Sequence, residues 1–557
     1  MVLEYNGQKF MTDNDLKVNV LGFWPRINIQ DTSLCEDFLK ICERDFLGGD
    51  EIVSYAQPLV SSGMDFNFLE REILKDIHNS EKKELKNILF EKTATGIGRG
   101  HSLGGLSGIV LGINGTKMID SGLTGFVMSR SLVTSSRRRE TTTEEIVIPE
   151  SLNAKPELLD EYLKISKDVF NIGQEFKEKF GKFGGVETFN KAIPYNNPAD
   201  LFIVLPLDTL ATLAFEVRED RANPNGNFLP RELIKLAEMF PNLTERIGAG
   251  IMYNQRTKVP RDTYLHYSVF KDPSLSNYPL EQAEMRGMPI EPLVIDHSKD
   301  LTDGFKKELI KVRQIFEEAR KIEDPKRLTD KSMECMLVLR GFVNEYNEAV
   351  RVKVLDTLSW RVWSEQKRHS TLRQNVESVY SAASRAYEII KDVWPQIKEI
   401  HENGRGDLPY DALDRAIVID ERLKKSSELA IPYVYHTARQ LIFYNKLLNE
   451  GIESRDALYI VPKNIRVRTL ENYDLANLID LELPLRLCNA CEPERKVTSW
   501  KKREVIVKIV PELDYFLQPK CNIGFCTEGN YCGHITNLRE YNRELHKQTK
   551  QAMLTNK

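Results

Sequence analysis

WRVWSEQKRHSTLRQNVESVY (360–380) is the stretch from which the rest of the chain is best interpreted. Within thirteen residues it holds Arg368, His369, Arg373, Asn375 and Ser378, and an amphipathic segment, SAASRAYEIIKDVWPQIKEI, follows. Arginine offers forked, permanently charged donors for phosphate or carboxylate, and histidine offers a donor whose charge changes near neutral pH. The small polar residues precede an expected helix start, where free backbone N–H groups also favour anions. The stretch therefore indicates an anion or nucleotide site, and the alternative is a solvated charged loop before a helix.

The spacing of these residues resembles the signature of the flavin-dependent thymidylate synthases, R-H-R-x-x-S-x-N-E-x-S-x-R-Y. Arg368, His369, Asn375 and Ser378 match it without gaps. The departures are Ser370 for the third arginine, Arg373 for the first serine, Val376 for the glutamate and Tyr380-Ser381 for the final R-Y.

Three later segments resemble the same family, in the same order along the chain. They are YNKLLNEGIESRDALYIVP (444–462), LPLRLCNACEPER (483–495) and PELDYFLQPKCNIGFCTEGNYCG (511–533). Asn472 is similar to a family asparagine, but Leu458 stands where the family has arginine. Asp474 stands where a family arginine binds the substrate phosphate, and a negative charge there would repel a phosphate dianion.

Length and composition limit the class of protein. A chain of 557 residues, 41% hydrophobic and 29% charged, predicts a globular protein of two or more domains. The net charge of −4 and the pI near 6.2 argue against nucleic acid as a partner. The sequence has no long apolar run and no signal-peptide pattern, so we expect no membrane association and a cytoplasmic location. Eight cysteines in so long a chain do not indicate a disulfide scaffold.

Apolar periodicity predicts a strand over 16–24 and helices over 156–181, 305–322, 331–350, 375–402 and 411–449. The glycine-rich run 96–122 contains no GxxxxGK[ST] and is not a phosphate-binding P-loop. Its Gly100-His101-Ser102, followed by GIVLGING, resembles the G-H-x-S segment of the synthases, which leads into a buried strand.

Two pairs of similar segments suggest an internal duplication. ADLFIVLPL (199–207) is similar to DALYIVP (456–462), and KMIDSGLTGFVM (117–128) is similar to VKVLDTLSWRVW (352–363). The duplication predicts a degenerate N-terminal copy at 1–285 and a better-preserved C-terminal copy at 286–557, joined near 270–292. In the N-terminal copy, Arg137 and Arg138 occupy the signature's position, and the alternative for them is a basic surface turn.

Cysteines gather in the C-terminal tail, at 488–534, and have two interpretations. They could form a tetrahedral zinc site, although their spacing is not that of a CxxC…CxxC motif; we expect instead reduced thiols that pack a compact knuckle. The residues are Cys488, Cys491, Cys521, Cys526 and Cys532.

The resemblance implies an α+β fold, in two diverged copies of the synthase domain, with a mixed or antiparallel sheet flanked by long helices. It implies an FAD enzyme that methylates dUMP to dTMP with methylenetetrahydrofolate and NADPH, built as a homodimer that imitates a tetramer of synthase domains. The alternative is a non-catalytic or repurposed protein that binds nucleotide or flavin or acts as a scaffold. The implied cofactor residues are Arg368, His369, Asn375 and Arg486; the implied substrate residues are Ser378, Arg373, Arg137 and Arg138; and the implied catalytic residues are Ser378 and Arg368.

Overall fold

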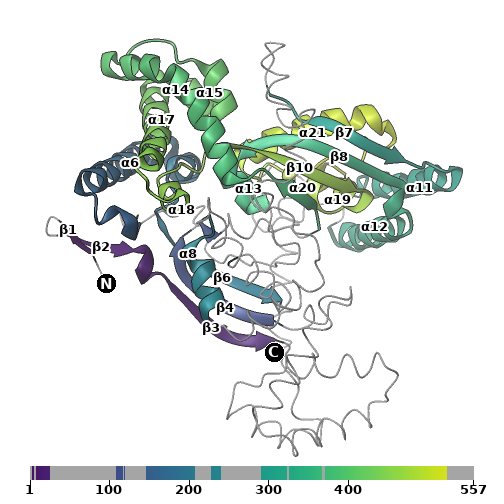
Figure 1. Cartoon of the computed structure of the whole chain (residues 1–557). Coiled ribbons are helices and arrows are strands. Elements are labelled where there is room, and N and C mark those ends of the chain that lie inside the picture. Colours follow the sequence, from purple (N-terminus) through teal and green to yellow (C-terminus); the bar gives the residue numbers. More distant parts are fainter. Residues whose placement is uncertain are drawn as a thin grey trace, which may run out of the picture. The chain divides into compact units, whose positions relative to one another are not determined.

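A computed structural model of the chain shows α+β structure in two compact units, each built from separated parts of the sequence (Figure 1). The first unit comprises residues 1–266, 378–408 and 426–463, and the second comprises residues 267–377, 409–425 and 464–557. The predicted division into copies at 285/286 stays a prediction. No described helix is long and apolar enough to cross a bilayer. The structure describes residues 3–5, 8–24, 108–116, 118–119, 146–206, 217, 228–239, 290–322, 325–366 and 371–523.

The first unit contains a three-stranded antiparallel sheet in the order β3-β4-β6. Its strands are β3 (Lys17–Trp24), β4 (Gly108–Thr116) and β6 (Pro198–Pro206), so the strands predicted at 16–24 and in the glycine-rich run are confirmed. Alternate residues of the central strand, such as Leu111 and Ile113, are buried, as expected for a sheet with one covered face. A smaller sheet joins β1 (Leu3–Tyr5), β2 (Gln8–Thr12) and β5 (Val147–Ile148).

Helices complete the described part of the first unit. Helix α14 packs against α17, and α17 packs against α6. The Ser378 hydroxyl accepts the Tyr380 N–H and so caps the start of α14, and Gly404, with φ of 63°, follows its last residue in the left-handed conformation that glycine tolerates best. The helices are α6 (Pro156–Ala192), α8 (Arg231–Met239), α14 (Val379–Asn403), α17 (Ser427–Asn449) and α18 (Ser454–Leu458).

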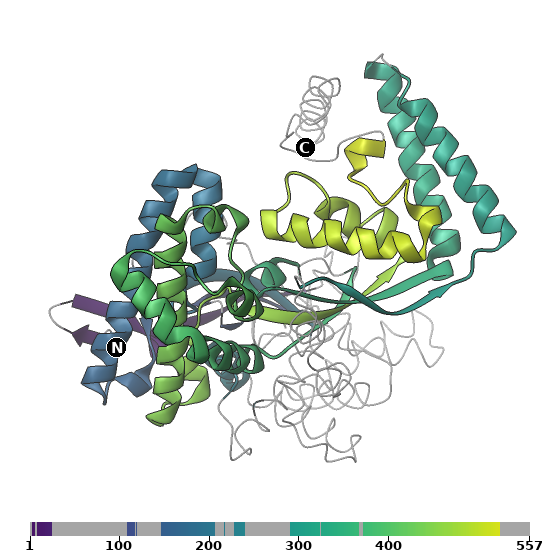
Figure 2. The same ribbon diagram turned by 90° about the horizontal axis from the view of Figure 1, so that it is seen from above.

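The second unit is organised around a four-stranded antiparallel sheet in the order β7-β8-β10-β9. One face of this sheet is apolar, since Val352 and Val354 on β8 and Tyr473 on β10 belong to one buried cluster. Figure 2 shows α21 running along this sheet, and α21 contacts both β7 and β8. The strands are β7 (Leu293–Lys299), β8 (Val350–Ser359), β9 (Arg373–Val376) and β10 (Arg466–Asp474).

Helices of the second unit cover the apolar face and complete its core. The predicted helices 305–322 and 331–350 are confirmed as an antiparallel pair, whose residues Phe305, Phe316 and Phe342 are buried in the same cluster. Burying each such side chain stabilises the fold by roughly 1.5–3 kcal/mol. The helices are α11 (Asp303–Ala319), α12 (Pro325–Tyr346), α13 (Trp360–Gln366), α19 (Leu475–Ile479), α20 (Glu482–Arg486) and α21 (Pro493–Ile509).

Two expectations from the sequence are wrong in detail. The single helix predicted over 411–449 is divided into α15 (Tyr410–Ala416), α16 (Glu421–Lys424) and α17, because Ile417 is extended and pairs with Ile465. The proposed equivalence of 199–207 and 456–462 also fails, since the former is strand β6 and the latter begins within helix α18. A short apolar run that ends on proline has the same appearance in a buried strand and in a buried helix.

Candidate functional site

Several residues to which the family motifs point lie together on the polar face of the β7-β8-β10-β9 sheet. The antiparallel register places Arg373 of β9 opposite Asn472 of β10, and Asn472 opposite Lys353 of β8. Directly opposite residues point to the same face, with Cβ atoms about 4.5–5.5 Å apart. Asn375 lies two residues beyond Arg373 and therefore shares this face. We call Lys353, Arg373, Asn375 and Asn472 the donor row.

Most of the donor row is not used by the fold. Arg373 is exposed and Asn375 and Asn472 are half-buried. Apart from a charge interaction between Arg373 and Glu348, the side chains of these three residues have no hydrogen-bond or ion-pair partner within the described residues. Lys353 Nζ lies 3.3 Å from Asp296 of β7, but both side chains are well exposed, so this ion pair contributes little. Two cationic groups and two amides therefore lie on the same face of the sheet and can bind an anionic ligand.

The opposite face of the same strands holds a closed network of buried charges. Glu471, between Leu470 and Asn472 on β10, accepts hydrogen bonds from Tyr473 Oη at 2.6 Å, Gln366 Nε2 at 2.6 Å and Lys502 Nζ at 2.7 Å. Burial opposes the charge of Glu471, but Lys502 and Arg495 outweigh it and lower the pKa of this carboxyl to about 2. The network therefore fixes β10 on one face of the sheet, and Asn472 lies on the other face of the same strand.

Asp356 completes this network from the neighbouring strand β8. Its carboxylate lies 2.8 Å from Lys502 Nζ, and burial raises the pKa of Asp356 in spite of that contact. Lys502 and Glu471 have no exposed surface, and Asp356 retains only 2%. This cluster could not be predicted from the sequence pattern, because Lys502 lies in the strongly basic segment WKKRE (500–504) and no spacing distinguishes it from its neighbours.

The first two signature residues, Arg368 and His369, lie outside the described residues, but the chain on both sides of them is anchored. Gln366, at the end of α13, is buried and donates to Glu471. After the gap, the Thr371 carbonyl accepts a hydrogen bond from Asn477 Nδ2 at 3.0 Å, and Leu372 is buried in the core. Both anchors belong to the second unit, which also carries the donor row.

Glu377 and Arg468 are functional candidates that the sequence comparison missed. The signature glutamate was assigned to Val376, which is buried and apolar, whereas the next residue, Glu377, is a buried carboxylate. It accepts hydrogen bonds from the Arg468 N–H at 3.1 Å and from Arg468 Nη2 at 2.6 Å. Allowing a shift of one place in the signature would have identified it.

Ser378, a predicted catalytic and substrate residue, is buried and belongs to the first unit, where it caps α14. The structure therefore gives it a role in helix capping, and its contact with substrate stays a prediction.

Asp474 does not place an uncompensated negative charge near the site. One oxygen accepts the Asn477 N–H at 2.9 Å and caps α19, and the other lies 3.3 Å from Arg351 Nη1. The repulsion expected from the sequence is therefore reduced by a neighbouring guanidinium.

Arg486 is not brought together with the donor row. Its Nε donates to Glu482 at 2.7 Å, and Glu482 also contacts Arg495 at 3.4 Å, so Arg486 joins the buried network on the other face of the sheet. Its assignment to a cofactor or nucleotide stays a prediction.

In addition to Arg368 and His369, four predicted residues lie outside the described residues: Arg137, Arg138, Cys526 and Cys532. Cys488 is buried, and Cys491 and Cys521 are half-buried; all three are free thiols. Burial raises the pKa of Cys491, as expected for a packing thiol rather than a reactive one. Within the described part of the chain, no three metal-binding side chains come together.

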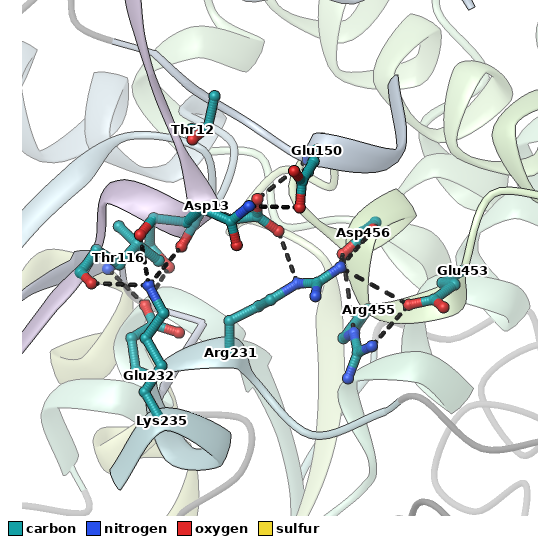
Figure 3. Close-up of polar contacts among 12 residues, drawn as sticks. Thr12, Asp13, Thr116, Glu150, Arg231, Glu232, Lys235, Glu453, Arg455 and Asp456 are labelled. Carbon is teal, nitrogen blue, oxygen red and sulfur yellow. Dashed lines mark hydrogen bonds and ion pairs between the residues drawn. The ribbon is translucent and has the colours of Figure 1, made fainter. Parts of the chain in front are cut away.

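A second charged cluster ties together distant segments of the first unit (Figure 3). Arg231 of α8 lies 2.7 Å from Asp13 and 3.1 Å from Asp456 of α18, and both carboxylates are fully buried. Burial raises the pKa of Asp13, although Arg231 opposes the shift. Lys235 donates to the carbonyls of Asp13 at 3.2 Å and of Leu16 at 2.9 Å. All these groups are occupied by one another, so the cluster stabilises the fold and leaves little capacity for a ligand.

Comparisons with known proteins agree with the motifs. No family model matches the chain. The flavin-dependent thymidylate synthase of Sulfurisphaera tokodaii is 24% identical over 180 residues, which is 32% of this chain and 65% of that protein. That of Pyrococcus abyssi is 30% identical over 126 residues, which is 22% of this chain and 51% of that protein.

The matched region thus spans about half to two thirds of the length of these relatives. A crystal structure of the Helicobacter pylori flavin-dependent thymidylate synthase complexed with FAD and dUMP aligns with 41% of this chain and 98% of its own, at 13% identity and a TM-score of 0.26. Over the matched part of its sequence, the chain is similar to the flavin-dependent thymidylate synthases.

Proposed function

We propose that the chain is an FAD-dependent thymidylate synthase, which methylates dUMP to dTMP with methylenetetrahydrofolate and NADPH. The observation that carries the proposal is the donor row: two cations and two amides, most of them without a side-chain partner, lie on one sheet face, and two of them, on β9, follow the signature residues Arg368 and His369 in the sequence. Charged donors suit a phosphate, and amides suit the carbonyl and N–H groups of a planar ring.

The donor row suits the two halves of a nucleotide. The guanidinium of Arg373 and the ammonium of Lys353 compensate the charge of a phosphate or pyrophosphate, and Arg373 can do so with two parallel hydrogen bonds. The amides of Asn375 and Asn472 can each donate to and accept from a ring carbonyl and its neighbouring N–H. Arg368 and His369, by the family signature, add donors for FAD.

FAD supplies the hydride in this chemistry, and the protein supplies binding, orientation and electrostatics. As negative charge develops on the carbonyl oxygens of the uracil ring, fixed amide donors stabilise it more than they stabilise the neutral ring. The buried network around Glu471 serves this purpose by fixing β10, because a donor that must reorganise during the reaction loses much of its effect.

The ligands proposed with this function are dUMP and a folate as substrates and NADPH as reductant. Family members build each site from several subunits, so we propose a homodimer for this longer chain. Arg137 and Arg138 remain proposed phosphate residues in the N-terminal half.

Growth of a thymidine auxotroph tests the proposal. Expression of the chain should restore growth without thymidine, and Arg368→Ala should abolish it. Arg405→Ala is a matched control, because Arg405 is exposed and has no partner in the described structure. Failure of the wild-type chain to restore growth, with the protein present in the cells, would contradict the proposal.

A second candidate function is a nucleotide- or flavin-binding protein without catalysis. The specific observation in its favour is that the buried carboxylate Glu377 is fully engaged by Arg468, so no free carboxylate occupies the signature's glutamate position. A purified protein that binds FAD and dUMP but forms no thymidylate would support this alternative.

A further inference from the structure

The sheets of the two units share one register, although their sequences differ. In the first unit, β4 pairs with β6 from Gly108↔Pro206 to Thr116↔Pro198. In the second, β8 pairs with β10 from Arg351↔Asp474 to Ser359↔Arg466. Both ladders contain nine residue pairs and end on a hydroxyl residue of the central strand.

The third strand of each sheet carries a β-bulge at the same place. In β3 the register shifts between Val20 and Gly22, and Val20 pairs with Leu111, five residues before Thr116. In β7 it shifts between Val294 and Asp296, and Val294 pairs with Val354, five residues before Ser359. Bulges are characteristic features of a protein family, so their coincidence is informative.

The hydroxyl residue at the end of each central strand makes the same contact. Thr116 donates its N–H and its O–H to Glu232, at 2.8 and 3.0 Å, and Ser359 donates the same two groups to Glu494, at 2.6 and 2.8 Å. Each glutamate is the second residue of its helix, α8 or α21.

A fourth correspondence lies just before the last strand. Pro194 and Pro462 each precede their strand, β6 or β10, by four residues, and they pair with each other in an antiparallel bridge. Equivalent residues meet in this way in a self-complementary contact.

From these four correspondences we infer that the chain contains two copies of one sheet motif and that, among the described residues, only the sheet of the C-terminal copy carries the donors of a nucleotide site. The shared register gives the equivalent positions directly. Lys353 lies six residues before Ser359, and the residue six before Thr116 is Val110; Asn472 lies six after Arg466, and the residue six after Pro198 is Val204. Val110 pairs with Val204, as Lys353 pairs with Asn472.

The N-terminal sheet has valine at the two positions where the C-terminal sheet has lysine and asparagine. It therefore lacks these side-chain donors but keeps residues that favour a strand. Valine favours a pleated, half-buried surface, and Val110 and Val204 are both half-buried. The N-terminal sheet therefore keeps its scaffold role and offers no side-chain donor at these two positions. One chain thus binds one dUMP on its sheets, and the proposed dimer binds two.

This inference depends on the proposed function for the identity of the nucleotide, and dUMP is the probe. Calorimetric titration of the full chain, with FAD present, should give one dUMP per chain. Asn472→Val, which copies the N-terminal position, should weaken binding roughly ten- to hundredfold, because a hydrogen-bonding partner of a bound ligand is lost. Val204→Thr, a change of similar size at the equivalent position, should leave the affinity unchanged.

The outcomes separate the inference from the enzyme activity. Two dUMP per chain, no binding of dUMP, or equal losses for Asn472→Val and Val204→Thr would overturn the inference. One dUMP per chain without formation of thymidylate would support it and contradict the proposed function. Circular dichroism of each variant shows whether it is folded, and Asn472→Ser serves as a second variant if Asn472→Val does not fold.

Discussion

Glu471 offers the sharpest test of how the site is supported, because one substitution removes the centre of the buried network. In Glu471→Gln the side chain keeps its size but loses its charge. Lys502 would then face a single carboxylate, that of Asp356, and Arg495 would lose its contact with Glu471 at 3.6 Å. Leaving buried charges without their partner typically costs about 3–5 kcal/mol.

The pKa of Glu471 gives a second route to the magnitude. A decrease from the ordinary value of 4.5 to about 2 corresponds to about 3 kcal/mol of stabilisation of the ionised form, at about 1.4 kcal/mol for each pKa unit. The lowered pKa has the sign that a stabilising ion pair requires, and from the typical cost of unpairing a buried charge we expect Glu471→Gln to lower the free energy of unfolding by about 3–5 kcal/mol.

Urea denaturation followed by tryptophan fluorescence measures this loss, because Trp360 and Trp363 are buried in the same unit. Glu317→Gln, on the exposed surface of α11, is the control and should stay within about 0.5 kcal/mol of wild type. Adding Lys502→Met to Glu471→Gln should recover part of the loss, because it removes the stranded charge. A loss below about 1 kcal/mol in Glu471→Gln would refute the network as the support of β10.

Three further predictions concern stability. Ser378→Ala should lower the free energy of unfolding by about 1 kcal/mol, because it removes the N-cap of α14; urea denaturation measures it, and no change would contradict the capping role. Arg231→Met should cost about 3–5 kcal/mol, because it leaves Asp13 and Asp456 buried without their cation, and a thermal unfolding temperature equal to that of wild type would contradict this. Stability should also fall as the pH decreases from about 4.5 towards about 2, because Glu471 has a lowered pKa in the folded state and its contribution is present only above that range; denaturation midpoints that stay constant over this range would contradict the prediction.

The elements that could be predicted from the sequence are those with one face buried against the core. Burial of one face sets the spacing of the apolar residues along a strand or helix. The strand at 16–24 and the helices α6, α11, α12 and α14 were all found where alternation or helical spacing indicated them. It also pointed to Asn375, which matches the family signature, and to Arg373, which is a charged donor in the same stretch.

The pairing of the strands could not be predicted from the sequence, and most of the site depends on that pairing. Lys353 and Asn472 become neighbours only through the register of β8 with β10, which depends on contacts between residues more than one hundred positions apart. The duplication predicted from the sequence rests on similar apolar runs, whereas the correspondence inferred from the structure rests on the hydroxyl–glutamate contacts of Thr116 and Ser359. Those contacts have no signal in a single sequence, because each joins residues far apart in the chain.

Thymidylate formation by the purified chain tests the central claim most directly, with FAD, NADPH, methylenetetrahydrofolate and dUMP supplied. The donor row predicts activity in the wild type and in the control Arg405→Ala. It predicts a loss of about ten- to hundredfold in kcat/KM for Arg373→Ala, since that change removes a charged donor to the nucleotide. Full activity in Arg373→Ala, or none in the wild type, would contradict the claim.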